Sequence, residues 1–194
     1  NSTVTTTMFA RPGMQGVRLD ATACMGQMRD GSAARLCARL FLLLDGRAAI
    51  IIDRVVLPHA GRVEARCFTP GEVTFARGRA TLRNGKTLLR AAFAANVPAT
   101  LHRASSIPTT PRSPATMLRW CSDRLHQDFT FATILSPGLV APRIKLQTGP
   151  KGLRIEVGAG AWRRVFRLRA DLTGSSTRSE KPRVSRCLPS RAKP

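Results

Sequence analysis

The chain has 194 residues, and its hydrophobic fraction of 43% excludes wholesale disorder. It carries 32 basic residues against 11 acidic ones, and the resulting net charge of +21 attracts polyanions such as nucleic acid, acidic polysaccharide or an anionic membrane surface. No apolar run reaches the roughly 18 residues of a membrane-spanning helix, so we expect no such helix.

The charge has two explanations. It serves polyanion binding, or it reflects GC-rich coding, because only five basic residues are lysine. The chain has no Tyr and two Trp, which leaves few stacking platforms for single-stranded nucleic acid. The opening residue is Asn1 rather than Met, so we expect Asn1 to be an internal position of a longer protein. The five cysteines contain no C-x-x-C pair and are predicted to be buried free thiols.

The apolar pattern is short and β-like throughout. Runs at 36–44 and 48–57 flank Asp45-Gly46, and runs at 79–83 and 87–94 flank Asn84-Gly85, two strong hairpin signals. Further strands are predicted at 63–68, 72–75, 116–121, 128–135, 144–147, 153–157 and 162–168. With at least ten short strands and no convincing helix, the pattern predicts an all-β fold, an antiparallel β-sandwich.

Two segments depart from this pattern. Residues 105–114 hold three prolines and are predicted to form a surface loop. From residue 173 the composition changes to Ser, Arg, Lys and Pro, so 173–194 is predicted to be a disordered basic tail behind a sandwich domain at 1–172.

Four phrases line up, in order, with those of one family. They are Asn1-Ser2-Thr3-Val4; Arg39-Leu40-Phe41-Leu42 with Ala49-Ile50-Ile51-Ile52-Asp53-Arg54-Val55; Ala65-Arg66-Cys67-Phe68-Thr69-Pro70-Gly71; and Phe131-Ala132-Thr133-Ile134-Leu135-Ser136-Pro137-Gly138. In order and spacing they resemble the C-terminal sheet domain of the heparinase II/III-like polysaccharide lyases. The resemblance covers 1–172 and leaves the tail unmatched.

The resemblance implies a two-part enzyme, in which a helical toroid precedes the sheet domain and an acidic polysaccharide binds between them. It implies β-elimination at a uronate, with Tyr and His as base and acid. The family's catalytic Tyr belongs to the helical part, and the His of the opening phrase falls just before Asn1. The chain alone is therefore expected to be an incomplete enzyme. Periplasmic or secreted location is implied by the resemblance only.

The resemblance also implies a zinc ion held by two His and one Asp in the sheet domain. The Asp matches Asp20, and the second His position is taken by Cys67, whose thiolate is a competent zinc ligand. The alternative is that Asp20 is a solvated turn residue and Cys67 a buried strand thiol.

Three further side chains are site candidates. His126 lies among carboxylates that would raise its pKa, and it is the candidate catalytic histidine. Arg167 and Arg169 share a strand face by alternation and are candidate contacts for sulfate or carboxylate. For each of them a solvent-exposed structural role is the alternative.

Three hypotheses follow. The first is a lyase sheet domain that contacts an anionic glycan and needs its helical partner for catalysis. The second is a non-catalytic module that binds carbohydrate, or nucleic acid non-specifically through charge. The third is a decayed or truncated fragment.

Overall fold

The computed structural model describes residues 3–24, 33–76, 78–110, 113–138, 140–173 and 175–178. These residues form fifteen β-strands and one short 3-10 helix, Thr22–Cys24, with no α-helix among them. Every strand pair recorded is antiparallel. The all-β prediction is therefore confirmed.

The strands form three sheets. The eight-stranded sheet has the order β1-β2-β3-β4-β11-β8-β7-β6, the three-stranded sheet β5-β10-β9 and the four-stranded sheet β12-β13-β14-β15. Their bounds are β1 Thr5–Arg11, β2 Met14–Asp20, β3 Leu36–Leu44, β4 Ala48–Gly61, β5 Glu64–Thr69, β6 Glu72–Ala76, β7 Arg79–Asn84, β8 Thr87–Ala95, β9 Ala99–Thr110, β10 Ser113–Ser122, β11 His126–Pro137, β12 Arg143–Gly149, β13 Gly152–Ala159, β14 Trp162–Leu168 and β15 Ser175–Arg178.

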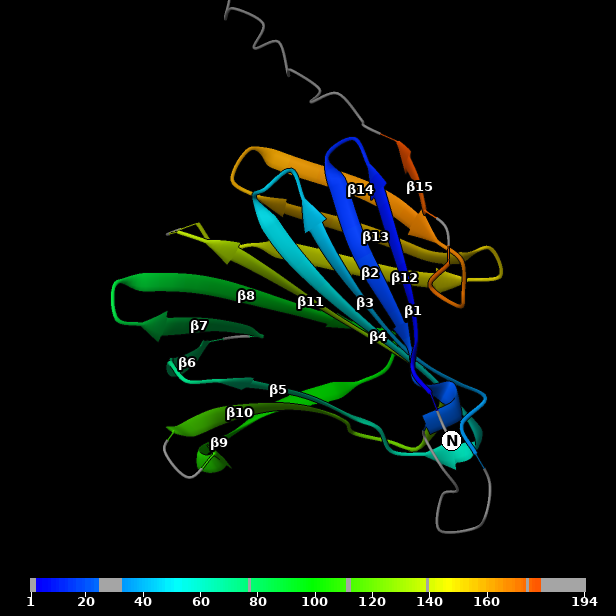
Figure 1. The fold of residues 1–194 in the computed structure, drawn as a ribbon, viewed down its shortest axis with the longest axis horizontal. Helices are drawn as coiled ribbons and strands as arrows, with labels where there is room; N and C mark the ends of the chain where they lie inside the picture. The colour runs from blue at the N-terminus through cyan, green and yellow to red at the C-terminus, as the bar shows by residue number, and fades with distance from the viewer. Residues whose placement is uncertain are drawn as a thin grey trace, which may run out of the picture.

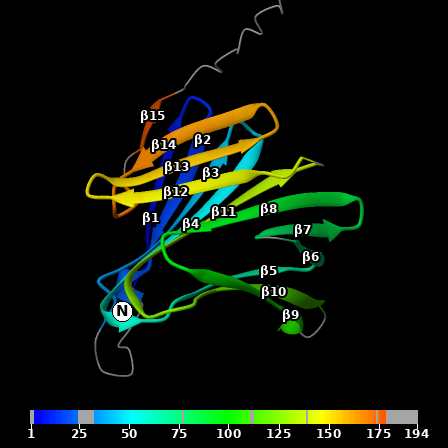
Figure 2. The same cartoon turned by 180° about the vertical axis from the view of Figure 1, so that it is seen from behind.

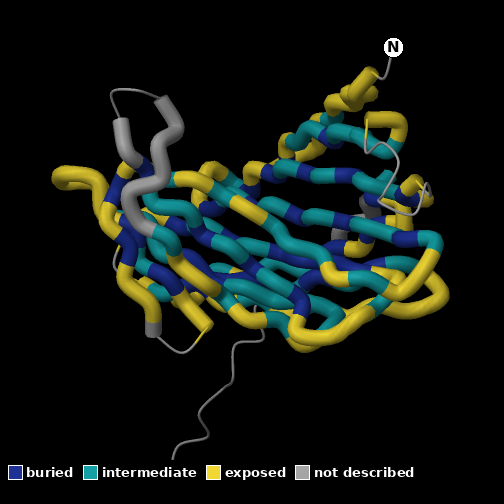
Figure 3. Tube along the Cα trace, turned by 90° about the horizontal axis from the view of Figure 1, so that it is seen from below, coloured by how far each residue is buried: buried dark blue, intermediate teal, exposed yellow. Residues whose placement is uncertain are grey.

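The eight-stranded sheet is the middle of three layers, with the four-stranded sheet over one face and the three-stranded sheet under the other (Figures 1 and 2). Successive side chains of a strand point to opposite faces. On β11, Ala132 joins the core shared with β13 and β14, while Phe131 joins the core shared with Trp120 of β10. Both β11 residues are essentially inaccessible to solvent, so each face of the eight-stranded sheet packs against a core. A further cluster, which includes Val73 and Leu118, also lies between this sheet and the three-stranded one. Figure 3 shows buried and half-buried residues along the strands.

The turn at Asp45-Gly46 joins β3 to β4 as predicted. Both residues have positive φ, 51° and 63°, and the Arg47 N–H donates to the Leu44 carbonyl at 2.8 Å. Gly tolerates this conformation freely and Asp is among the few other residues that adopt it. The hairpin places the long apolar strands β3 and β4 side by side at the centre of the sheet.

The loop predicted at 105–114 is wrong. β9 runs to Thr110 and β10 begins at Ser113, and the two strands pair through this segment with register shifts near Pro114. Proline lacks a donor but is tolerated on edge strands, at strand starts and beside bulges. β9 is an edge strand and Pro114 is the second residue of β10, next to a register shift, so the proline-rich composition is compatible with strand pairing.

Four strands lie outside the predicted set: β9, described above, and β1, β2 and β15. β1 and β2 form the edge of the eight-stranded sheet, and β15 pairs with β14 although it lies in the segment predicted as a tail. Residues 179–194 lie outside the described residues. Among the described residues no helix is long and apolar enough to cross a membrane.

Candidate functional site

Arg167 lies on the outer surface of the four-stranded sheet. It is exposed on β14 and stands opposite Arg154 of β13. Arg169 is also exposed but follows the end of β14, and its backbone N–H donates to the Thr173 carbonyl at 3.2 Å. Only Arg167 therefore belongs to the sheet surface, while Arg169 belongs to the turn after it.

A pocket of about 510 Å³ lies between the eight-stranded and three-stranded sheets. Its polar lining comes chiefly from Arg39, Asp53, Arg62 and Glu64. Arg39 and Asp53 stand opposite each other on β3 and β4, and the Arg39 Nε donates to Asp53 Oδ1 at 2.5 Å. The pocket thus has a charged floor held in place by a cross-strand ion pair.

Two cysteines lie near this ion pair. Burial raises the pKa of the Cys37 thiol, and the Asp53 carboxylate raises it further. Burial likewise raises the pKa of the Cys67 thiol, which Arg39 opposes and Asp53 reinforces. Both thiols are free, so they stay protonated and weakly nucleophilic at neutral pH.

The predicted zinc ligands do not fit a metal site. The Asp20 carboxylate accepts hydrogen bonds from Arg18 Nη2 at 2.7 Å and from the Thr22 hydroxyl at 2.6 Å, so both its oxygens are engaged. Cys67 lies on another sheet and would need to lose its proton to bind zinc. Among the described residues no three His, Cys, Asp or Glu side chains are grouped to hold a metal ion. Zinc binding by Asp20 and Cys67 stays a prediction.

His126 begins β11 and is half-buried. Its ring lies edge-on to Phe129, with centroids 6.0 Å apart and an interplanar angle of 89°. Its Nε2 is buried and has no hydrogen-bond partner in the described part of the chain. These contacts favour a packing role over proton transfer to a solvent-facing substrate.

The similarity of this chain to known proteins lies in its fold. No protein-family model and no curated protein matches the chain. Among solved structures, a heparinase III aligns with 87% of this chain at a TM-score of 0.66 and 13% identity, over 30% of its own length. The fold is that of a heparinase domain.

Other solved structures agree. Heparan sulfate lyase HepC from Pedobacter heparinus aligns with 87% of this chain at a TM-score of 0.63 and 10% identity. A further heparinase III aligns with 82% of it at a TM-score of 0.62. The chain spans 26–30% of the length of these heparinase structures. The heparinase resemblance predicted from the four phrases is confirmed at the level of the fold.

Proposed function

We propose that the chain is the sheet domain of a heparinase-type lyase that cleaves uronate-containing polysaccharide by β-elimination. The observation that carries this proposal is the heparinase fold match, which takes in 87% of the chain but only 30% of each of two matched structures. A fold match at 10–13% identity does not transfer an activity, so the reaction and the substrate are part of the proposal.

In this proposal the chain binds and orients glycan rather than moving protons. β-Elimination needs a base for the C5 proton and an acid for the leaving oxygen. The chain contains no Tyr, and His126 packs against Phe129. Arg167 and Arg169 are exposed guanidinium groups, which pair with sulfate and carboxylate through two parallel hydrogen bonds. We assign them to substrate contact and the proton transfers to a separate helical domain.

An apolar hollow supports the need for a partner domain. It measures about 600 Å³ and lies over β1–β4, and its lining includes Met8, Val17, Phe41 and Leu43. These residues share the sheet face that the three-stranded sheet covers elsewhere. Met8 is 81% exposed and Leu43 48% exposed, which is costly unless another surface covers them. We propose that the helical domain docks here.

The test is an absorbance assay for the unsaturated uronate that β-elimination produces. The chain alone and a protein that joins it to its helical domain are assayed on heparin-like, chondroitin-like and alginate-like substrates. We expect activity only in the joined protein. Absence of activity in both, with the joined protein folded by circular dichroism, overturns the lyase proposal.

A binding module without lyase activity is the second candidate. The exposed cluster of basic side chains around Arg167 favours it, because such a surface binds polyanions whether or not catalysis follows. In the uronate assay this candidate predicts glycan binding by both proteins and product from neither.

A further inference from the structure

The outer face of the four-stranded sheet is strongly basic. Alternation along β12, β13 and β14 brings out one set of charged side chains, five basic and one acidic: Arg143, Lys145, Arg154, Arg163, Arg167 and Glu156. Strand pairing aligns them in rows, with Arg154 opposite Arg167 and Lys145 opposite Glu156. The inner faces of the same strands bear Ile155, Phe166 and other core residues, so this charged surface is backed by a rigid core.

Two shallow hollows lie on this outer face. One, of about 300 Å³, has Lys151, Arg154 and Arg167 in its lining. The other, of about 240 Å³, has Arg143, Lys145, Arg163 and Trp162 in its lining, with Glu156 as its acidic group. Each hollow therefore presents three basic side chains. The two hollows lie toward opposite ends of β13.

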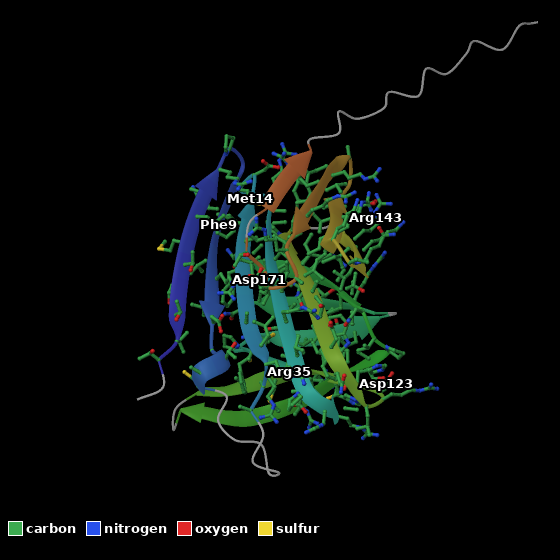
Figure 4. The ribbon with its side chains drawn as sticks, turned by 90° about the vertical axis from the view of Figure 1, so that its right-hand side faces the viewer. Phe9, Met14, Arg35, Asp123, Arg143 and Asp171 are labelled. Atoms are coloured by element: carbon green, nitrogen blue, oxygen red, sulfur yellow. The ribbon has the colours of Figure 1, made fainter. Side chains whose placement is uncertain are left out.

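Only some of the cations on this face form ion pairs with described residues. Glu156 pairs with Arg163 at 2.9 Å and with Arg154 at 3.6 Å. Arg143, Lys145 and Arg167 are exposed and have no hydrogen bond or ion pair to any described residue. Figure 4 shows Arg143 on the outer side of the sheet, directed away from the eight-stranded sheet.

We propose that this face binds an anionic oligosaccharide through its carboxylate or sulfate groups. Adjacent strands lie about 4.8 Å apart and alternate residues about 7 Å apart, so three strands place the cations within an area of roughly 10 by 13 Å. That area suits a glycan segment of a few sugar units. Guanidinium groups held at fixed spacing on a sheet lose little freedom on binding, which favours bidentate recognition. This inference rests on the assignment of Arg167 to glycan contact and extends it to a whole sheet face, but it needs no catalysis.

Glycan is favoured over nucleic acid by the shape and composition of the face. A single-stranded nucleic acid binds through successive aromatic platforms, and the two hollows have only Trp162 among their lining residues. The face is a flat sheet surface rather than a helix or ribbon that enters a groove. A flexible glycan with carboxylate or sulfate groups is therefore the ligand that we favour for this face.

The experiment compares two charge-matched triple variants. Arg143→Gln/Lys145→Gln/Arg167→Gln removes the three unpaired cations of the face. Arg79→Gln/Arg83→Gln/Lys86→Gln removes three exposed cations, two from β7 and one from the turn between β7 and β8. Both variants keep residues 179–194, so any charge effect of that segment cancels. The probe is a heparin hexasaccharide, titrated by calorimetry at fixed ionic strength, with a short duplex DNA as the second ligand.

We expect the face variant to bind the hexasaccharide at least about tenfold more weakly and the β7–β8 variant to stay within about threefold of the unaltered chain. Equal weakening of both variants overturns the proposal, because it shows that net charge alone binds the glycan. DNA binding that is tighter than hexasaccharide binding and is lost in the face variant also overturns it. Neither result depends on lyase activity, so failure here is distinguishable from failure of the lyase proposal.

Discussion

Arg164 of β14 holds Asp45 of the β3–β4 turn through two parallel bonds, Nε to Oδ2 at 2.7 Å and Nη2 to Oδ1 at 2.5 Å. The Trp162 indole N–H adds a third bond to Asp45 Oδ2 at 2.9 Å. Asp45 therefore has two roles. It adopts the positive φ of the turn, and it joins the four-stranded sheet to the eight-stranded one.

We expect Asp45→Ala to lower the free energy of unfolding by about 2 kcal/mol, because it leaves two partly buried donors without their acceptor. Asp45→Asn keeps a residue suited to positive φ and one carbonyl acceptor, so its loss should be smaller. Urea unfolding followed by tryptophan fluorescence measures both. A loss near zero for Asp45→Asn would show that the ion pair contributes nothing beyond the turn conformation.

The same pair predicts an acid dependence. The hydrogen bond from Arg164 lowers the pKa of the Asp45 carboxyl, and burial only partly opposes it. Its contribution to stability is therefore complete above the unfolded pKa of about 3.9 and is lost as pH falls through the folded pKa. Unfolding midpoints measured from pH 6 down to 3 should fall less steeply for Asp45→Asn than for the unaltered chain. Parallel slopes would contradict this assignment.

Arg54 is a buried cation that fastens the turn after β14. It is 6% exposed, pairs with Asp128 and donates from Nε to the Ala170 carbonyl at 3.0 Å. Burial lowers its pKa. We expect Arg54→Ala to cost about 2 kcal/mol in thermal or urea unfolding, since it empties a buried site and removes the hydrogen bonds to the Ala170 carbonyl and to Asp128, whose carboxylate is half exposed and can be resolvated.

Arg54→Lys is the matched control for that variant, because it keeps the charge but not the forked geometry. It should lie between Arg54→Ala and the unaltered chain. A cost below about 0.5 kcal/mol for Arg54→Ala, the size of an ordinary surface substitution, would refute a structural role for the buried guanidinium.

The apolar hollow over β1–β4 gives a prediction about association. Leu43→Asp should leave the unfolding midpoint of the isolated chain nearly unchanged, since Leu43 is 48% exposed. It should weaken association with a separately produced helical domain by at least about tenfold in analytical ultracentrifugation. Val140→Asp, at another exposed apolar side chain, serves as the control. Equal effects of the two variants would move the docking surface elsewhere.

The family resemblance implies a bound zinc ion, whereas the contacts of the two predicted ligands lead us to expect none in the chain alone. Asp20 is engaged by Arg18 and Thr22, and Cys67 is a protonated thiol, so we expect the chain alone to retain no zinc after dialysis against a micromolar zinc buffer. Metal analysis by atomic absorption measures this. One equivalent of zinc retained by the chain and lost in Cys67→Ser would show that Cys67 is a zinc ligand and would contradict this expectation.

The local signals in the sequence predict the hairpins but not their register. Asp45-Gly46 marks the β3–β4 turn, and a two-residue connection would have set Leu44 opposite Arg47. The structure pairs Leu44 with Ala48, and this one-residue offset is what brings Arg39 opposite Asp53. A one-residue slip changes which side chains meet, so the charged pocket floor was not predictable from spacing alone.

The basic face shows the same limit. Alternation correctly places Arg167 on the outside of β14. Its neighbours Arg154 and Lys145 come from β13 and β12, and only the pairing of these strands makes them one surface. The loop prediction for the proline-rich segment at 105–114 was wrong for a different reason. Composition does not reveal that β9 is an edge strand, where proline is tolerated.

The two buried arginines of the central sheet also set an order of events during synthesis. Arg18 donates to the Asp171 carbonyl, 153 residues later, and Arg54 to the Ala170 carbonyl, 116 residues later. At roughly 5–20 residues per second, the ribosome takes about 6 to 30 seconds to deliver these acceptors. Until then both guanidinium groups lack these carbonyl acceptors, although Asp20 and Asp128 are already present, and one face of the central sheet stays uncovered. The nascent chain therefore gains its four-stranded layer last, and in the interval chaperones can bind the apolar face of the central sheet that this layer later covers.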